Sequence, residues 1–188
     1  FVAVSMPIGN LPESGISTVS SQIVFLKQNT DISNLLAFYQ ADDEADSNAQ
    51  ILQAKAEAID AYFEMYDMPL KGTGMKMVQE GEKNGLDWRL LPAISVIEST
   101  GGKFACKGTT HSFFGWGSCK IAFTSKDHAI EIIAWNLGGN NPNTARYYAG
   151  KTTKQILQKY NPPHIVPLYA QKVMKVMDNI GEKEMTAS

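Results

Sequence analysis

The sequence lacks a strong excess of either charge. Its 188 residues include 17 Lys and Arg and 19 Asp and Glu, which gives a formal net charge of -2 at pH 7. Proteins that bind nucleic acid or an anionic membrane surface usually carry a marked basic patch or stripe. The charge balance therefore argues against both kinds of partner and favours a neutral or uncharged polymer as the substrate.

Long apolar runs and internal repeats are also missing. No apolar run approaches the roughly 18 residues that indicate a transmembrane helix, and the sequence contains no low-complexity tract. The hydrophobic fraction of 44% and the charged fraction of 19% are typical of a globular protein. The length fits one domain, with an appendage at most, that can bury a sizeable core.

Cysteine is scarce, since only Cys106 and Cys119 occur. In an exported protein this pair would form a disulfide, and closing a loop of this size contributes roughly 3 kcal/mol in the chain-entropy view. The alternative is a metal site made of Cys106, His111 and Cys119. Neither a C-x-x-C pair nor an H-x-x-x-H pair supplies the usual ligand spacing, so we expect the disulfide, with no metal and no other cofactor.

Helical periodicity and capping residues predict a mainly α fold with one irregular lobe or small hairpin at residues 101–125. An N-terminal arm or linker is expected at residues 1–46, with a short helix near residues 32–38 and an acidic break at residues 41–46. The domain proper is expected at residues 47–188. Its helices are predicted at residues 48–66, 73–84, 87–98, 124–137, 152–160 and 168–180, with capping pairs at Thr124/Asp127 and Thr152/Gln155.

Glu98 lies at the end of an otherwise apolar run, Leu90–Ile97. Apolar side chains recur there at helical spacing, and Gly101 and Gly102 can end the helix, so Glu98 is expected in the last turn of a buried helix. Apolar neighbours and the C-terminal end of the helix dipole both raise the pKa of such a carboxyl group, which suits it to act as a general acid. In the alternative interpretation, Glu98 ends a core helix at the surface with its side chain in water.

A second carboxylate is missing near Glu98, because residues 99–126 contain no Asp or Glu. Glycoside cleavage needs one acid and often a second carboxylate across the bond. The next acids, Asp127 and Glu131, also fit capping and surface roles. The pattern favours one carboxyl group acting as acid and base, while the substrate supplies the nucleophile through an N-acetyl group or the 6-hydroxyl of a muramoyl ring.

Aromatic side chains follow Glu98 in the sequence. The phenol of Tyr160, beside Asn161, is placed to hold a carboxylate or an N-acetyl carbonyl by hydrogen bond, and Tyr148 offers the same chemistry. Phe114 and Trp116 offer flat faces for sugar rings, or equally a small core under the cysteine pair. Both interpretations of this pair of aromatic residues stay open.

In this order, the motifs resemble the lysozyme-like superfamily, near the bacterial glucosaminidase and lytic transglycosylase families. Ala93–Ser99 resembles the family's helix-ending Glu-Ser motif, whose Glu is the catalytic acid. Phe114–Ser118 resembles the loop that lines the sugar cleft. Tyr160-Asn161, followed by Tyr169 and an apolar helix, is similar to the Tyr-Asn motif and closing helix of the transglycosylases. The resemblance covers about two thirds of the chain.

The resemblance implies a secreted, periplasmic or cell-surface enzyme that cleaves β-1,4 bonds between N-acetylglucosamine and N-acetylmuramic acid in peptidoglycan. It implies that Glu98 is the acid and base and that Tyr160 orients it or the substrate. The substrate-binding residues it implies are Ser99, Phe114, Gly115, Trp116, Ser118, Tyr148 and Asn161.

The lobe lacks the further acid that glucosaminidases often carry in a hairpin lobe. Hydrolysis and formation of a 1,6-anhydro sugar therefore both stay open. An alternative on the same fold is a catalytically idle module that binds glycan or takes part in cell-wall assembly. Membership of a larger cell-surface assembly is also open.

Overall fold

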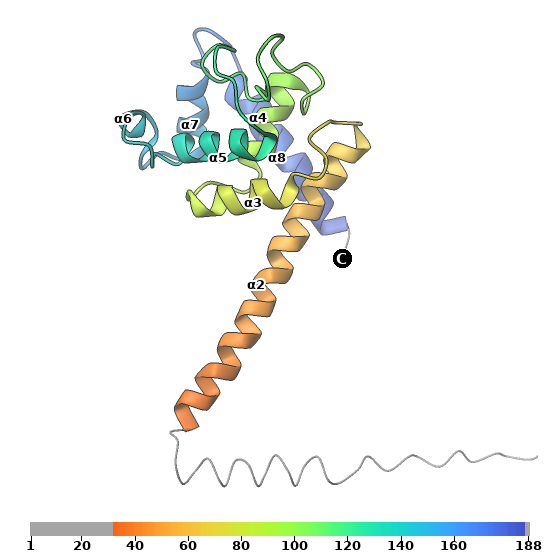
Figure 1. The fold of residues 1–188 in the computed structure, drawn as a ribbon, viewed down its shortest axis with the longest axis vertical. Helices are drawn as coiled ribbons and strands as arrows, with labels where there is room; N and C mark the ends of the chain where they lie inside the picture. The colour runs from red at the N-terminus through yellow and green to blue at the C-terminus, as the bar shows by residue number, and fades with distance from the viewer. Residues whose placement is uncertain (1–31, 187–188) are drawn as a thin grey trace, which may run out of the picture. The chain divides into compact units, whose positions relative to one another are not determined.

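The computed structural model describes residues 32–186, with side chains described for residues 46–181. Residues 32–186 contain seven helices and no strands (Figure 1), so the prediction of a mainly helical fold is confirmed. The helices are α2 (Ile32–Met65), α3 (Gly74–Lys83), α4 (Leu90–Ser99), α5 (Lys126–Leu137), α6 (Ala145–Tyr148), α7 (Thr153–Tyr160) and α8 (Tyr169–Thr186). No helix in this part of the chain is both long enough and apolar enough to cross a membrane.

The N-terminal half of α2 differs from the prediction. The acidic stretch at residues 41–46 continues the helix where a break was expected, so that prediction was wrong. The stretch contains neither Gly nor Pro, and its Ala and Glu residues have high helix propensity, which keeps the backbone helical. Residues 1–31 of the predicted arm lie outside the described residues. The chain divides into two compact units, Phe1–Asn48 and Ala49–Ser188, and the second is described below.

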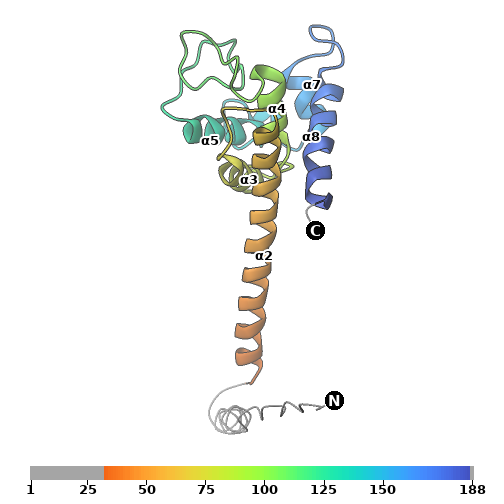
Figure 2. The same ribbon diagram turned by 90° about the vertical axis from the view of Figure 1, so that its right-hand side faces the viewer.

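The second unit is built around α4. This helix packs against α3, α5 and α8, and both ribbon views place it among them (Figures 1 and 2). Leu90, Leu91 and Ile94 are fully buried, and burying each such side chain contributes about 1.5–3 kcal/mol. Pro92 lies in the first turn, where the helix does not need its missing N–H, so it does not break α4.

Side-chain caps set the starts of two helices. The predicted capping box of α7 is confirmed, because Thr152 Oγ1 accepts from the backbone N–H of Gln155 and Gln155 Oε1 accepts from that of Thr152. The start of α5 differs from the prediction. Ser125, not Thr124, caps it by accepting from the backbone N–H of His128 at 3.0 Å, while Thr124 Oγ1 lies 2.8 Å from the ring Nδ1 of His128.

Residues 101–125, which we call the lobe, are made of turns and irregular segments, so the predicted irregular lobe is confirmed and the alternative of a small hairpin is wrong. The backbone repeatedly enters the left-handed region, which interrupts an extended strand. Its positive-φ residues include Gly108, Gly115, Gly117, Ser118 and Cys119.

The predicted disulfide between Cys106 and Cys119 is present, with the two Cα atoms 5.6 Å apart. Because both sulfur atoms are in this bond, the alternative metal site with His111 loses two of its three ligands. Among the described residues, no group of three or more His, Cys, Asp or Glu is placed to hold a metal ion.

Ser99 ties the end of α4 to the lobe. Its buried hydroxyl lies 2.7 Å from the carbonyl of Phe113, to which it donates, and accepts from the backbone N–H of Gly102 at 3.0 Å. The chain turns sharply here, because Thr100, Gly101 and Gly102 all have positive φ. Ser99 therefore fixes where the lobe leaves the helix that carries Glu98.

Replacing Ser99 with Ala should destabilise the protein. The change leaves the buried carbonyl of Phe113 without the hydroxyl that donates to it, which costs about 1–3 kcal/mol of unfolding free energy. Chemical denaturation measures this loss. Ser112→Ala is the matched control, since Ser112 is also buried but its hydroxyl has no hydrogen-bond partner. Ser112→Ala should be neutral or slightly stabilising, and equal losses in the two variants would contradict the role given to Ser99.

Candidate active site

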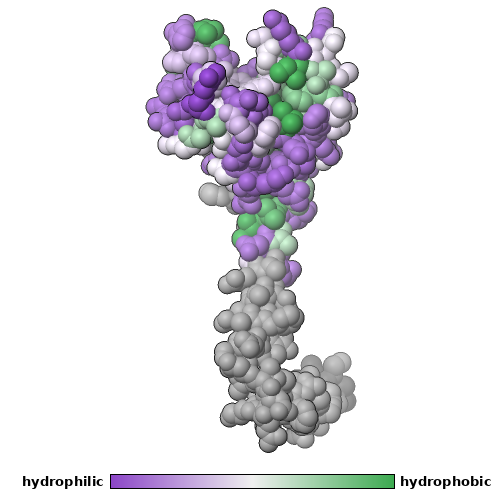
Figure 3. Space-filling view, turned by 60° about the vertical axis from the view of Figure 1, so that its left-hand side comes forward, coloured by the Kyte–Doolittle hydropathy of each residue, from purple (hydrophilic) through white to green (hydrophobic). Residues whose placement is uncertain are grey.

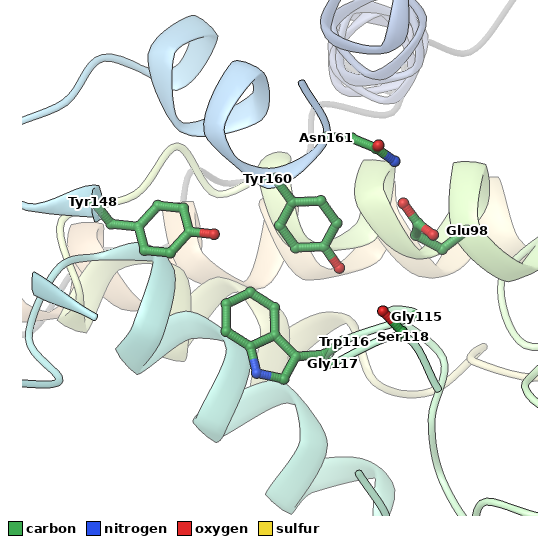
Figure 4. A pocket seen from close by; sticks show the side chains of 8 residues that line it. All are labelled: Glu98, Gly115, Trp116, Gly117, Ser118, Tyr148, Tyr160 and Asn161. Atoms are coloured by element: carbon green, nitrogen blue, oxygen red, sulfur yellow. The ribbon is translucent and has the colours of Figure 1, made fainter. Parts of the chain in front are cut away.

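A cleft of about 460 Å³ opens at the C-terminal end of α4. The space-filling view shows a notch at the top of the folded unit, with mainly hydrophilic residues on one side and a hydrophobic patch on the other (Figure 3). The residues that line the cleft come from α4, the lobe, α6 and the end of α7. They are Glu98, Gly115, Trp116, Gly117, Ser118, Tyr148, Tyr160 and Asn161 (Figure 4). Glu98 supplies the only carboxyl group among these lining residues.

Glu98 is partly buried in the last turn of α4, as predicted. Burial raises the pKa of its carboxyl group above the ordinary value, and a hydrogen bond from Tyr169 offsets part of that increase. The hydroxyl of Tyr169 donates to Oε1 of Glu98 at 2.6 Å. The side chain thus faces a cleft instead of extending into bulk water, which argues against the interpretation of Glu98 as a solvated helix end.

The backbone of Gly115 approaches the other oxygen of Glu98. A Cβ atom at this position would lie 2.6 Å from Oε2, closer than non-bonded atoms approach. Gly115 also has a φ of 63°, which favours glycine. Two requirements therefore select glycine here: a left-handed backbone and room for the carboxyl group.

Tyr160 lies in the cleft but does not bond to Glu98. Its hydroxyl donates to the backbone carbonyl of Phe114, and its ring stacks on that of Tyr169 with centroids 6.0 Å apart. Burial, followed by the nearby charge of Glu98, raises the pKa of the Tyr160 phenol well above its ordinary value. This phenol stays neutral and holds the loop, whereas Tyr169 holds the acid.

The sequence motifs included Tyr169, between Tyr160-Asn161 and the closing apolar helix, but gave it no role in the site. Its contact with Glu98 spans 71 residues of sequence, and no local pattern encodes a contact of that range. The available signal was the single phenol at the start of an otherwise amphipathic helix.

Tyr148 leaves a phenol group exposed to the cleft. Its side chain is mostly buried, and burial raises the pKa of its hydroxyl to about 12. Figure 4 shows the hydroxyl pointing toward Tyr160, and the ring lies 6.1 Å from that of Trp116. No hydrogen-bond partner for this hydroxyl is found among the described residues. It is therefore a donor placed for a ligand.

The other predicted site residues divide into two groups. Gly115, Trp116, Ser118 and Asn161 line the cleft with Glu98. Ser99 and Phe114 are buried and do not line it, and they act on the cleft through the backbone of the lobe.

The two acids considered as second carboxylates lie elsewhere. Asp127 and Glu131 are exposed on α5, and neither lines the cleft. Glu131 lines a different pocket, with Ile132 and Trp135. The structure does not bring either acid to Glu98.

Chemically, the cleft presents one carboxyl group that keeps its proton to a higher pH than usual. Because Tyr169 donates to Oε1, the proton of the neutral acid belongs on Oε2. The indole of Trp116 and the phenol of Tyr148 offer a flat face and a hydrogen-bond donor beside it. This combination suits proton donation to an oxygen of a ring-containing, uncharged ligand.

Replacing Tyr169 with Phe should raise the pKa of Glu98 further. The variant keeps the ring and the burial but removes the hydrogen bond that stabilises the carboxylate form. Carbon-13 NMR titration of glutamate side-chain carboxyl groups would measure the shift, with Glu98→Gln identifying the resonance. Tyr160→Phe is the control, because its hydroxyl bonds to a backbone carbonyl instead. An unchanged or lowered pKa in Tyr169→Phe would contradict this account of the acid.

Comparisons with known proteins provide no relative for this chain. No protein-family model matches it, and neither a curated protein nor a solved structure does. The function is therefore argued from the sequence motifs and from the geometry of the cleft.

Proposed function

We propose that this protein is a glycosidase that cleaves the β-1,4 bonds of peptidoglycan between N-acetylglucosamine and N-acetylmuramic acid, on a lysozyme-like arrangement of helices. The observation that carries the proposal is the partly buried carboxyl group of Glu98. Its pKa is raised by burial, and it lies in a cleft lined by Trp116 and two tyrosines. A raised carboxyl pKa in an aromatic, otherwise uncharged cleft is the environment that a glycosidic general acid needs.

In the proposed reaction, Glu98 protonates the glycosidic oxygen through Oε2 while Tyr169 holds Oε1. The bond from the sugar C1 to that oxygen breaks, and the leaving sugar takes the proton. No second carboxylate lines the cleft, so the nucleophile at C1 comes from the substrate.

Two substrate nucleophiles fit this arrangement. An N-acetyl oxygen would give a cyclic intermediate that water opens, with the Glu98 carboxylate accepting the proton of that water. A 6-hydroxyl would bond to C1 after the leaving sugar has departed, pass its proton to the Glu98 carboxylate and leave a 1,6-anhydro sugar. Both routes return Glu98 to its protonated form.

The remaining cleft residues would position the sugar. Trp116 offers its indole face to a pyranose ring, and the free hydroxyl of Tyr148 would donate to an N-acetyl carbonyl. The side-chain amide of Asn161 supplies both a donor and an acceptor beside Glu98. The proposal places the protein at the cell surface, in the periplasm or in secretions, where its substrate lies. The Cys106–Cys119 disulfide supports such an oxidising location.

Replacing Glu98 with Gln should abolish cleavage of purified sacculi. The amide keeps the shape of the side chain but cannot donate the proton, and loss of a general acid lowers the rate by about 10²–10⁴-fold. Release of soluble muropeptides measures the effect. Glu131→Gln is the control, since Glu131 is an exposed carboxylate outside the cleft. Full activity in Glu98→Gln would disprove the assignment.

The products of the wild-type reaction distinguish the two chemistries. A 1,6-anhydro product is lighter than the hydrolysed sugar by one water, which mass spectrometry resolves. Binding of sacculi without turnover in the wild type would instead favour a catalytically idle glycan-binding or wall-assembly module, since a fold alone does not confer activity.

The rate of cleavage should fall as the pH rises through the pKa of Glu98. The general acid must be protonated, and burial raises this pKa above the ordinary value, so activity should persist to a higher pH than for a solvated glutamate. The alkaline limb of a kcat/KM profile measures it. A limb that does not move in Tyr169→Phe, although the NMR pKa of Glu98 does, would show that another group limits the reaction.

A further inference from the structure

The charge of the lobe differs from that of the rest of the chain. Residues 101–125 contain three lysines, Lys103, Lys107 and Lys120, and no Asp or Glu. The whole chain has a net charge of -2, so the three positive charges of the lobe leave the remainder with a net charge of -5. The low overall charge therefore hides a basic segment next to Glu98.

The three lobe lysines are exposed and have no anionic partner. None of them makes an ion pair or a side-chain hydrogen bond with another described residue. Elsewhere in the unit, Lys55, Lys71, Lys76 and Lys83 each pair with a glutamate. Other exposed lysines, Lys151, Lys154, Lys172 and Lys175, make no ion pair with a described residue. The lobe therefore carries three unpaired ammonium groups and no carboxylate of its own.

The disulfide links the two backbone segments that carry two of these lysines. Lys107 follows Cys106 and Lys120 follows Cys119, and the two cysteine Cα atoms are 5.6 Å apart. Like charges on one short segment repel one another, and an anion bound beside them would offset that repulsion.

The lobe is continuous with the cleft. The backbone that supplies Gly115, Trp116, Gly117 and Ser118 to the cleft wall reaches Lys120 two residues later. The cleft wall itself carries no charge apart from Glu98. A polymer that laid uncharged sugars along the cleft and carried anionic groups beside them would match both surfaces.

We propose that the lobe lysines bind the carboxylate groups of peptides attached to the same glycan strand whose bond lies at Glu98. This inference rests on the proposed function and narrows its substrate from glycan in general to peptide-bearing strands. Exposed ammonium groups attract such carboxylates over about 10 Å at 0.1 M salt, so the attraction weakens as salt increases. The strand is the source of the anion, because the lobe and the cleft share one segment of backbone.

The test compares binding by two triple variants in the Glu98→Gln background, so that no turnover is needed. One variant carries Lys103→Gln, Lys107→Gln and Lys120→Gln. The control carries Lys154→Gln, Lys172→Gln and Lys175→Gln, which removes the same charge from exposed positions on α7 and α8. The probes are soluble peptidoglycan strands bearing their peptides, and the same strands after carbodiimide-driven amidation of their carboxyl groups. Both preparations are stripped of phosphodiester wall polymers.

The lobe variant should bind peptide-bearing strands about tenfold more weakly than its parent in dilute salt, and the control should lose at most about twofold. The difference should disappear in roughly 1 M salt, where the Debye length is about 3 Å, and on the amidated strands. Equal losses in the two triple variants would overturn the proposal, as would a loss that persists after amidation.

Two further probes identify other anionic partners. Strands that retain phosphodiester polymer are tested in the same way. If the lobe variant loses binding only to these strands, the proposal is overturned in favour of that polymer. Phe104 is 77% exposed beside Lys103, so anionic phospholipid vesicles are included, and lobe-dependent binding to them alone would also overturn it. Lack of cleavage by the wild type would instead refute the proposed function, because strand binding is measured separately.

Discussion

The hydrogen bond between Tyr169 and Glu98 joins the first residue of α8 to the last turn of α4, and the geometry of the cleft depends on it. The carboxyl group must be far enough from water for its pKa to rise, yet it must still reach a ligand. Burial meets the first requirement, and the 2.6 Å bond from Tyr169 fixes one oxygen so that the other stays available. The close packing of α4 against α8 brings the two side chains together.

The loop beside Glu98 must leave room for its carboxyl group, and two hydrogen bonds fix the position of that loop. Ser99 donates to the carbonyl of Phe113, and Tyr160 donates to the carbonyl of Phe114. These two fixed carbonyls immediately precede Gly115, whose lack of a side chain leaves room for Oε2. Neither Ser99 nor Tyr160 bonds to the acid, so both act on it through the position of the backbone. Ser99, the residue that follows Glu98 in the sequence, is therefore a positioning residue.

The sequence was sufficient for features that depend on local patterns. Leu90 and Ile94 repeat at helical spacing and Gly101 and Gly102 follow, so the position of Glu98 in the last turn of a buried helix could be predicted. The capping box of α7 was visible for the same reason. Features that depend on contacts between distant parts of the chain could not be predicted in this way. The choice of Tyr169 over Tyr160 as the partner of Glu98 is decided by the packing of α8 on α4.

The predicted acidic break was wrong, and of the two alternatives for the lobe the structure shows the irregular one. The acidic stretch at residues 41–46 looked like an interruption because it has no apolar face, but helix propensity does not require one. In the lobe, short apolar pieces between glycines left both an irregular loop and a small hairpin open. The left-handed backbone at Gly115, Gly117 and Ser118 excludes extended strands there and instead brings the loop against Glu98. The left-handed backbone that excludes the hairpin therefore also shapes the cleft.

The absence of acids from the lobe affects both Glu98 and the lobe lysines. A carboxylate close to Glu98 would raise its pKa further through repulsion and would also compete for the lobe lysines. Without one, Glu98 is left as the single acid of the cleft, while Lys103, Lys107 and Lys120 remain unpaired. The same omission thus leaves a solitary proton donor and a basic surface beside it. A polymer with uncharged sugars and anionic branches would use both properties, the sugars at the proton donor and the branches at the basic surface.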